Sequence, residues 1–402
     1  MTTRDTATRG SADAVVVGGG TIGGWCAWFL RQSGLERVVL LEAGTMGKGA
    51  SSRAAGMVRA QGGTETAVRL GQWTQDFYRS QRENLPLDSG FVEQGYCMPC
   101  FTAAEIEQAQ VRIAMQQSLG LDVRWLGPAA FDELNPAMAP GRTLGSSYAP
   151  GDGYIDPPRN VLAYTAALVT AGVDIREGVA FTGLRTQGGR VVAVTTSDGE
   201  IATDRVVLTG GPQLADVGML AGARVPAGGT RHQVVVTEPH PDLAADRLPM
   251  VFDVQAGIYW RPEEGGLLWG MSNPEEPPGV AREFDHDYFA VMRARMADLV
   301  PVTGKLGLRR SWAATIDFTP DHLPILGPLL TVDGTVDGAV VAAAGGHGMM
   351  WGPAVSRVAA DLVLTGRTDL LDVTDLDLDR FDADGRSRLA PDPIALPFPE
   401  RT

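Results

Sequence analysis

The fold is decided by the stretch Val15–Glu42, which reads VVVGGGTIGGWCAWFLRQSGLERVVLLE. Its three valines predict a strand buried on both faces, and this strand ends in the spacing G-x-G-x-x-G, formed by Gly18, Gly20 and Gly23. The first glycine permits a tight turn, the second lets a pyrophosphate approach the backbone, and the third lets the next helix pack close to the strand. The stretch is therefore typical of a dinucleotide-binding βαβ unit.

The rest of the stretch supplies the other parts of this unit. A helix expected from about Thr21 to Arg31 directs its free N–H groups and the positive end of its dipole at the phosphates. Val38–Leu41 is expected to form a second parallel strand, which ends in Glu42. An acid at this position accepts hydrogen bonds from an adenosine ribose and disfavours a 2′-phosphate. Strand, glycines, helix, strand and acid in this order favour nucleotide binding over a glycine-rich turn without a ligand.

The composition is typical of a globular protein. The 402 residues are 44% hydrophobic and 20% charged, which allows a large core and indicates two or three compact units. The net charge of −14 argues against a nucleic-acid partner, because phosphate binding requires clustered Lys and Arg. No apolar run approaches the ~18 residues that span a bilayer, and no signal peptide precedes the first strand, so we expect a cytoplasmic protein without a membrane partner.

The cysteine content predicts a reducing compartment and no disulfide framework. Cys26, Cys97 and Cys100 are the three cysteines, an odd and small number. Cys97 and Cys100 have the spacing of a redox motif, but a thioredoxin-like context and a second cysteine pair are both missing. We interpret these thiols as structural or incidental and expect no metal site.

Two further strands are expected to end in glycine loops. Val206–Leu208 leads into Thr209-Gly210-Gly211, and Val340–Ala344 leads into Gly345-Gly346-His347-Gly348, with a helix expected from about Pro353 to Leu364. Each of these strands would deliver its glycine loop to a ligand edge of the sheet, as the first strand does.

The segments between these loops predict a meander and a second sheet. Strands joined by glycine turns are expected at 179–186, 190–196 and 200–208. A mostly antiparallel sheet that could cover a cofactor is expected from strands at 231–237, 257–261 and 267–271, with a helix at 285–300 on its outer surface. The acidic tail after Asp369 is interpreted as a solvated surface.

These features together resemble the D-amino-acid-oxidase-like family of FAD-dependent oxidoreductases, the group that contains sarcosine oxidase and glycine oxidase. The matching motifs are VVVGGGTIGG, LLEAG, GASSRAAG, GYIDP, RHQVVVTEP, YWRP, WAATIDFTPDHLPILG and AAGGHGMMWGP. The resemblance implies an α/β (α+β) fold with a Rossmann-like FAD-binding domain and a discontinuous, mostly antiparallel β-sheet substrate domain. The implied ranges are 12–85, 145–220 and 315–375 for the FAD-binding domain, 86–144 and 221–314 for the substrate domain, and 376–402 for a C-terminal tail.

The resemblance also implies FAD as the cofactor. The residues expected to contact it are carried over from the family motifs, with Val179 near the adenine: Gly18, Gly20, Thr21, Ile22, Gly23, Glu42, Ala43, Ser51, Ser52, Arg53, Ala55, Gly56, Val179, Gly210, Gly346, His347, Gly348 and Met349. Some relatives attach FAD covalently through a His in the first loop or a Cys shortly before the T-P-D motif. Arg53 occupies the first position and no cysteine lies near Asp321 in the sequence, so we expect non-covalent FAD.

Four residues are candidates for contacts with the substrate. Arg59 lies where sarcosine-oxidase-like members carry a carboxylate-binding arginine, with a surface or FAD-phosphate contact as the alternative. Tyr259 lies where glycine-oxidase-like relatives place a substrate-facing tyrosine, with a core tyrosine as the alternative. Arg261 and Arg310 are further candidates for the carboxylate. His232 is interpreted as a satisfied strand residue.

Three positions depart from the family pattern. Ile316 replaces the arginine that glycine-oxidase-like members carry four residues after Trp312, which leaves the carboxylate contact open. Leu268 and Met350 replace lysines of sarcosine oxidase, which argues for slow reoxidation by oxygen because a fixed positive charge stabilises superoxide.

The implied chemistry is transfer of a hydride from the carbon beside a neutral amine to the flavin. An apolar wall expected from Leu268, Trp269, Met349, Met350 and Trp351 favours an N-alkyl substituent, which gains about 0.8 kcal/mol per buried methylene. The predicted function is an oxidase that converts an N-substituted, glycine-type amino acid and O2 to glyoxylate, an amine and H2O2. An FAD-dependent dehydrogenase with another acceptor and a non-catalytic flavin-binding factor are the alternatives.

Overall fold

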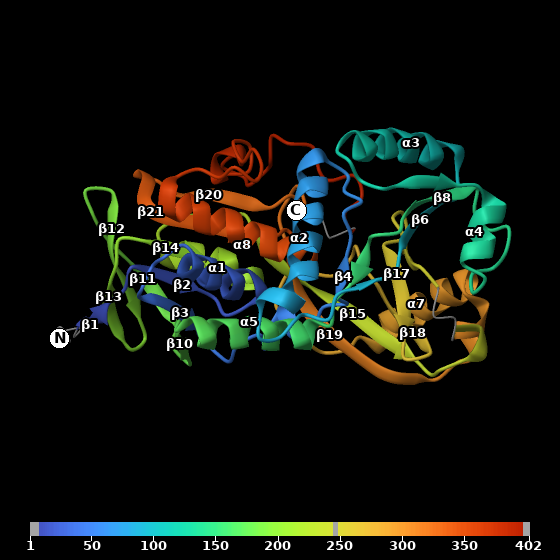
Figure 1. The fold of residues 1–402 in the computed structure, drawn as a ribbon, viewed down its shortest axis with the longest axis horizontal. Coiled ribbons are helices and arrows are strands. Elements are labelled where there is room, and N and C mark those ends of the chain that lie inside the picture. The colour runs from blue at the N-terminus through green and yellow to red at the C-terminus, as the bar shows by residue number, and fades with distance from the viewer. Residues whose placement is uncertain (1–7, 244–247, 397–402) are drawn as a thin grey trace.

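The computed structural model describes residues 8–243 and 248–396, and within these ranges the strands form three sheets. Figure 1 shows an elongated molecule with a ten-stranded sheet in one half and an eight-stranded sheet in the other. This arrangement of two sheets confirms the predicted fold class. Residues 1–7 and the end of the predicted tail, residues 397–402, lie outside the described residues.

The ten-stranded sheet is built around the valine run of the glycine motif. β2 (Ala14–Val17) pairs in parallel with β3 (Val38–Glu42) and with β14 (Val206–Leu208), and β14 pairs in parallel with β21 (Gly334–Ala343). The side chains of β2 alternate between two hydrophobic cores, as expected of a strand buried on both faces. Because β2, β14 and β21 are parallel, the three predicted glycine loops lie at the same edge of the sheet.

Three helices pack on one face of this sheet (Figure 1). They are α1 (Thr21–Gln32), α5 (Pro157–Ala171) and α8 (Gly348–Thr365). At the start of α5, the Asp156 carboxylate accepts a hydrogen bond of 2.9 Å from the backbone N–H of Arg159, so Asp156 caps this helix.

The helix after the last glycine loop begins earlier than predicted. The expectation placed its start near Pro353, whereas α8 begins at Gly348. A proline inside a helix has no N–H for the carbonyl one turn earlier. Here the Tyr78 hydroxyl donates a hydrogen bond of 3.0 Å to the Met349 carbonyl, which is the acceptor that Pro353 leaves free. The helix therefore tolerates the proline and extends its N-terminus to the glycine loop.

The predicted meander is present, but its last strand was predicted too long. β11 (Phe181–Gln187), β12 (Arg190–Thr196) and β13 (Gly199–Ala202) pair in antiparallel order. The expected strand at 200–208 is divided, because the chain bends after β13 and continues as β14 in the parallel part of the sheet. The Thr203 hydroxyl accepts a hydrogen bond of 3.3 Å from the backbone N–H of Arg205, a local contact that competes with strand pairing.

The second sheet is mostly antiparallel, as predicted, and one of its faces is covered by α7 (His286–Leu299). Its strands, in spatial order, are β19 (Leu308–Phe318), β15 (Gly228–Thr237), β18 (Gly266–Met271), β17 (Ile258–Glu263), β16 (Met250–Asp253), β6 (Tyr96–Cys100), β8 (Gly145–Ala149) and β7 (Arg124–Leu126). β8 and part of β19 fall in ranges predicted for the FAD-binding domain, so sheet membership differs from those ranges at these two strands. The remaining domain boundaries stay a prediction.

The remaining helices and strands join or edge the two halves. The helices are α2 (Glu65–Asn84), α3 (Ala103–Ser118), α4 (Pro128–Leu134) and α6 (Leu214–Leu220). The strands are β1 (Thr8–Ser11), β10 (Asp174–Glu177) and β20 (Ile325–Thr331) of the ten-stranded sheet, and β4 (Met57–Val58), β5 (Val92–Glu93) and β9 (Gly153–Tyr154) of a three-stranded sheet.

The C-terminal tail is held by the aspartate of the T-P-D motif. Asp321 accepts two hydrogen bonds from the guanidinium of Arg380, at 2.7 and 3.0 Å, and one of 2.6 Å from the Ser387 hydroxyl. The backbone carbonyl of Asp321 accepts a hydrogen bond of 3.1 Å from the N–H of Asp392. Asp392 and Ile394 are buried, so the interpretation of the tail as a solvated surface was wrong for this part.

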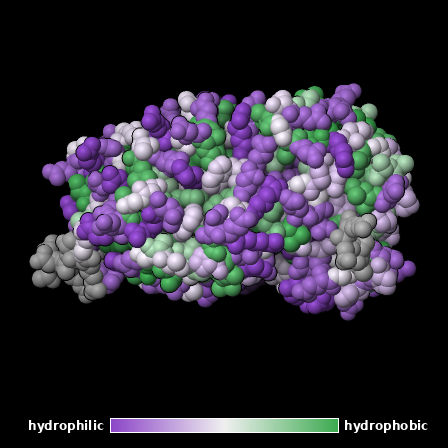
Figure 2. Space-filling view, in the orientation of Figure 1, coloured by the Kyte–Doolittle hydropathy of each residue, from purple (hydrophilic) through white to green (hydrophobic). Residues whose placement is uncertain are grey.

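Figure 2 shows that hydrophilic residues are spread over both halves of the visible face, with hydrophobic residues scattered between them. Large exposed hydrophobic side chains come from several different parts of the chain, for example Val111, Leu162 and Val332. Among the described residues, no helix combines the length and the apolar character that a membrane crossing requires.

Candidate active site

The glycine motif forms a turn that leaves space for a ligand. Gly18 has a φ of 106°, which favours glycine, and a Cβ on Gly23 would overlap the carbonyl oxygen of Gly18. Gly20 differs, because the nearest atom to a Cβ there is the Ser51 hydroxyl oxygen at 3.1 Å. The packing of the chain thus requires glycine at 18 and 23, whereas the glycine at 20 keeps backbone open to an approaching group. This pattern fits the pyrophosphate of a dinucleotide.

The start of α1 has the features of an anion-binding site. Its N-cap residue is Gly20, which has no side chain to cap the helix, and its first turn contains no acidic residue. The backbone N–H of Thr21 donates to the Ser51 hydroxyl at 2.9 Å, which brings the predicted GASSRAAG loop to the helix start. Helix N-termini bind phosphates through N–H groups and the helix dipole, so this geometry fits the phosphate part of FAD.

Glu42 is fixed at the end of the second strand. Its carboxylate accepts hydrogen bonds from the N–H groups of Gly19, at 2.8 Å, and Gly44, at 2.7 Å. The backbone N–H of Val179 donates to the Glu42 carbonyl at 3.1 Å, so the residue expected near the adenine lies beside the residue expected at the ribose. The remaining lone pairs of the carboxylate can accept from ribose hydroxyls.

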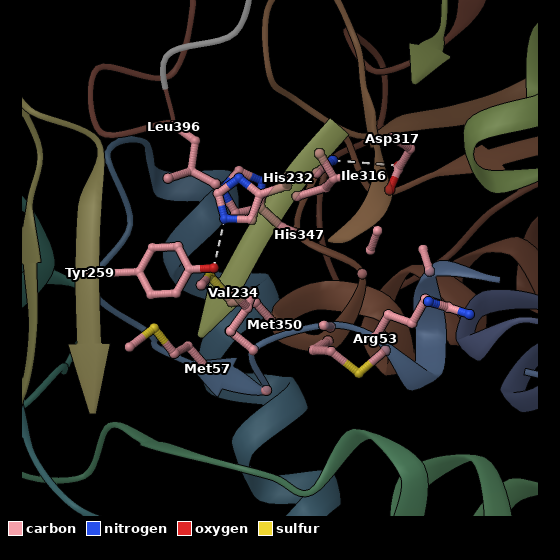
Figure 3. Close-up of a pocket in the computed structure, with 18 of the residues that line it drawn as sticks. Arg53, Met57, His232, Val234, Tyr259, Ile316, Asp317, His347, Met350 and Leu396 are labelled. Atoms are coloured by element: carbon pink, nitrogen blue, oxygen red, sulfur yellow. Dashed lines mark hydrogen bonds between the residues drawn. The ribbon is translucent and has the colours of Figure 1, made fainter. Parts of the chain in front are cut away.

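A cavity with about 910 Å³ of empty space, partly open to solvent, continues from the last glycine loop to the eight-stranded sheet. Figure 3 shows Tyr259, His232, Leu396 and Met57 around one part of it, whereas Arg53 and Asp317 lie on the opposite side. Of the predicted site residues, those that line this cavity are Arg53, Ala55, Gly56, Arg59, Tyr259, Gly346, His347, Gly348 and Met349.

The other predicted site residues do not line this cavity. Most of them were predicted to contact the cofactor. They are Gly18, Gly20, Thr21, Ile22, Gly23, Glu42, Ala43, Ser51, Ser52, Val179 and Gly210. The position of Arg261 is set by other groups, because its guanidinium pairs with Glu263 at 2.6 Å and donates to the Ala55 carbonyl at 3.1 Å. Arg310 pairs with the same Glu263 at 2.8 Å and is exposed.

His232 and Tyr259 form a hydrogen-bonded pair in the cavity wall (Figure 3). His232 Nε2 lies 2.6 Å from the Tyr259 hydroxyl oxygen, and both side chains are buried. The two residues come from β15 and β17, which lie on either side of β18. A Cβ on Gly270 of β18 would lie 2.5 Å from the Tyr259 hydroxyl oxygen, so this glycine makes room for the tyrosine.

Burial sets the protonation state of this pair. It lowers the pKa of His232 to about 4 and raises the pKa of Tyr259, so both side chains are neutral at pH 7. His232 Nδ1 is buried and has no hydrogen-bond partner among the described residues. The interpretation of His232 as a satisfied strand residue was therefore wrong for this nitrogen, which can bond to a ligand in the cavity.

The low pKa of His232 predicts a pH dependence of stability. An unfolded histidine titrates near pH 6.5 and the folded one near 4, so the unfolded chain binds more protons between these values. The contribution of neutral, buried His232 to the free energy of unfolding is therefore complete above about pH 6.5 and is lost as the pH falls toward 4. Between pH 6.5 and pH 5 the free energy of unfolding should fall by about 2 kcal/mol. Urea unfolding of the wild type and His232→Gln should show this difference in pH sensitivity, and parallel curves would contradict it.

Arg59 is a buried cation in the cavity wall. Its Nη1 donates to the Gln61 carbonyl and its Nη2 donates to the Ile394 carbonyl at 3.1 Å. Among the described residues, no carboxylate lies within ion-pair distance of this guanidinium, and burial raises the pKa of the nearby carboxyls of Asp152 and Asp392. Two carbonyls thus orient Arg59, while its other three N–H donors and its charge have no partner among residues 8–243 and 248–396 and can bind an anion.

The apolar wall differs from the predicted one. Met349 and Met350 line the cavity, whereas Leu268, Trp269 and Trp351 pack in hydrophobic cores. The wall includes residues that were not predicted: Met57, Val234, Phe252, Ile316, Ile394 and Leu396. His232 and Val234 are two positions apart on β15, so their side chains lie on the same face, and this spacing could have placed both at the cavity. The apolar, proline-rich end of the tail is the corresponding signal for Ile394 and Leu396.

Asp317 was also missed. It lines the cavity, and its carboxylate accepts a hydrogen bond of 3.4 Å from the backbone N–H of Gly346. Burial raises its pKa. A charged residue between the apolar residues Ile316 and Phe318 of β19 was the signal for a role at the cavity.

Comparison with known proteins identifies the family. The family model described as FAD dependent oxidoreductase matches residues 13–362. The chain is 30% identical to 4-methylaminobutanoate oxidase (formaldehyde-forming) of Paenarthrobacter nicotinovorans over 93% of this chain and 46% of that protein. It is 28% identical to mitochondrial sarcosine dehydrogenase of Mus musculus over 92% of this chain and 41% of that protein. The chain thus spans less than half the length of these curated relatives.

A solved structure agrees with this result. The crystal structure of glycine oxidase from Geobacillus kaustophilus matches with a TM-score of 0.81 and 27% identity, covering 93% of this chain and all of that chain. The family match, the glycine turn with its open Gly20 and the fixed Glu42 agree on FAD as the cofactor. The chain belongs to the D-amino-acid-oxidase-like family of FAD-dependent oxidoreductases.

Proposed function

We propose that this chain oxidises the C–N bond of an N-alkylated amino acid, with the carboxylate of the substrate held by Arg59. The observation that carries this proposal is the buried guanidinium of Arg59, which has no carboxylate partner among the described residues and lies in a cavity that is otherwise largely apolar. A buried charge without a partner is costly, and a substrate carboxylate would remove this cost by accepting hydrogen bonds from the free donors of Arg59.

The other residues of the cavity suit an amine that must be neutral to react. Desolvation by apolar groups such as Met57, Val234 and Met350 lowers the pKa of a bound amine, which frees its lone pair. His232 and Tyr259 are themselves neutral, so they add no charge, and His232 Nδ1 can hydrogen-bond to the substrate. Bound FAD would supply the acceptor for the hydride of the carbon beside the nitrogen, and hydrolysis of the resulting imine by water would give a carbonyl compound and an amine.

The names of two relatives support an N-alkylated substrate. Both 4-methylaminobutanoate and sarcosine carry an N-methyl group and a carboxylate. We propose an N-alkylglycine or a longer N-methyl amino acid as the substrate of this chain. Oxidation of the glycine carbon releases glyoxylate, whereas oxidation of an N-methyl carbon releases formaldehyde, so the aldehyde identifies the carbon that loses hydride.

The proposal has two forms, which differ in the electron acceptor that reoxidises the flavin. The first is an oxidase that reduces O2 to H2O2. The second is a dehydrogenase that passes electrons to a carrier, and one observation favours it: among the described residues that line the cavity, Arg53 and Arg59 are the cations and none is a lysine. Non-covalent attachment of FAD also stays a prediction.

The experiment is anaerobic mixing of the FAD-loaded protein with glycine, sarcosine, longer N-alkylglycines and 4-methylaminobutanoate. Bleaching of the flavin by the N-alkylated compounds is expected, and glyoxylate and formaldehyde are assayed as products. Air is then admitted, and the rate of reoxidation and the yield of H2O2 separate the oxidase from the dehydrogenase. A flavin that none of these compounds bleaches would refute the proposal.

A conservative change at Arg59 tests its role. Arg59→Lys keeps the charge but loses the planar fork that holds a carboxylate, so kcat/KM should fall about 10- to 100-fold, mainly through KM. Steady-state kinetics with the substrate that bleaches the flavin measures this effect. Arg310→Lys is the matched control, because Arg310 is exposed and outside the cavity. Equal kinetics for the two variants would remove Arg59 from the site.

A further inference from the structure

The end of the described tail crosses the substrate part of the cavity. We call the segment Asp392–Leu396 the strap. Ile394 is fully buried and packs with Tyr96, Phe252 and Tyr259, and both Ile394 and Leu396 line the cavity. Figure 3 shows Leu396 on the same side of the cavity as His232 and Tyr259. The strap therefore contributes to the wall next to the pair that faces the substrate.

The strap has a defined conformation. The Asp392 carboxylate accepts a hydrogen bond of 3.0 Å from the N–H of Ile394, and the Asp392 carbonyl accepts one of 3.2 Å from the N–H of Ala395. The N–H of Asp392 donates to the carbonyl of Asp321, which anchors the start of the strap. A Cβ on Gly63 would overlap the Asp392 carboxylate, so the loop after β4 leaves room for the strap only because this residue is glycine.

The strap also contacts the proposed carboxylate-binding residue. The Ile394 carbonyl accepts a hydrogen bond of 3.1 Å from Arg59 Nη2, and the Gln61 carbonyl accepts one from Nη1. These two contacts hold the plane of the guanidinium. One element thus orients Arg59 through its backbone and forms part of the apolar wall through Leu396.

From this geometry we infer that the strap is a specificity-determining element, in which Leu396 limits the length of the substrate's N-substituent and the Ile394 carbonyl positions Arg59. This inference rests on the proposed function for the identity of the substrate. Replacing the NH of an N-alkylglycine by CH2 gives a straight-chain carboxylate of the same length, which binds but cannot be oxidised. Butyrate corresponds to sarcosine, and hexanoate to N-propylglycine.

The test measures dissociation constants of straight-chain carboxylates from acetate to octanoate, from the absorbance change of the FAD-loaded protein. In the wild type, affinity is expected to rise with length and then to level off or fall where the chain meets Leu396. In Leu396→Ala the rise should continue by at least one further methylene, at about fourfold per methylene. In Leu396→Phe the limit should move to a shorter chain.

Leu389→Ala is the matched control, because Leu389 belongs to the same tail but does not line the cavity. Its length profile should equal that of the wild type. Identical profiles for the wild type, Leu396→Ala and Leu396→Phe would overturn the inference. Failure of the proposed function is recognised separately, since the carboxylate profiles would then shift as expected although no N-alkylated amino acid bleaches the flavin.

Discussion

A Gly20→Val protein is expected to fold but to retain no FAD. In the structure, a Cβ at position 20 meets only the Ser51 hydroxyl oxygen, at 3.1 Å, so the chain itself has room for a side chain with a small adjustment. The branched side chain would instead occupy the path of the pyrophosphate beside the N-terminus of α1. The ratio of flavin to protein absorbance after purification measures the loss, and circular dichroism measures the fold. Wild-type FAD content in this variant would defeat the nucleotide assignment.

Gly23→Ala is the contrasting variant. Its Cβ would overlap the carbonyl oxygen of Gly18, so α1 could no longer lie close to β2. This variant should lose stability as a whole, and its thermal unfolding midpoint should fall with or without added FAD. If Gly20→Val folds without FAD whereas Gly23→Ala loses stability, then Gly20 serves ligand binding and Gly23 serves packing within the same motif.

The nucleotide part of the molecule could be predicted because its signals are local. A valine run, a glycine turn, a helix and Glu42 follow one another within a single stretch, and each has its own physical requirement. Where a distant partner intervenes, prediction fails. The start of α8 was misplaced because the Tyr78 hydroxyl, far away in the sequence, satisfies the carbonyl that Pro353 leaves free.

The substrate part depends on such distant partners throughout. His232 and Tyr259 meet because β18 lies between their strands and carries Gly270 at the crossing point. Strand order and the missing side chain are properties of the sheet, so they cannot be read from either motif alone. Arg59 was selected from its position in a family motif, but its two carbonyl partners, at Gln61 and Ile394, appear only in the folded chain.

The tail illustrates the limit of composition. Its many aspartates predict a solvated surface, yet Arg380 is almost completely buried because Asp321 provides a bidentate partner. Ile394 is likewise buried in a hydrophobic cluster that includes Phe252 and Tyr259, which are distant in the sequence. A charged segment can therefore enter a core when a carboxylate elsewhere neutralises its cation, and no window of the local sequence contains both partners.

The second large effect is expected at this ion pair. Asp321→Ala leaves the buried Arg380 guanidinium without its carboxylate and removes an acceptor from Ser387, so the free energy of unfolding should fall by about 3–5 kcal/mol. Urea unfolding followed by circular dichroism measures this change. A loss below about 1 kcal/mol would show that the pair does not hold the tail.

The double variant Asp321→Ala/Arg380→Met separates the unpaired charge from the lost contact. Removing the guanidinium abolishes the cost of an uncompensated buried charge, and a side chain that fits among the tail residues can restore packing. The double variant should therefore be more stable than Asp321→Ala alone.

If the tail also positions the strap through this pair, butyrate should bind more weakly to FAD-loaded Asp321→Ala than to the wild type, because the Ile394 carbonyl no longer holds Arg59 in place. An unchanged butyrate affinity in a destabilised Asp321→Ala protein would limit the ion pair to a structural role and leave the strap dependent on its own contacts with Phe252 and Tyr259.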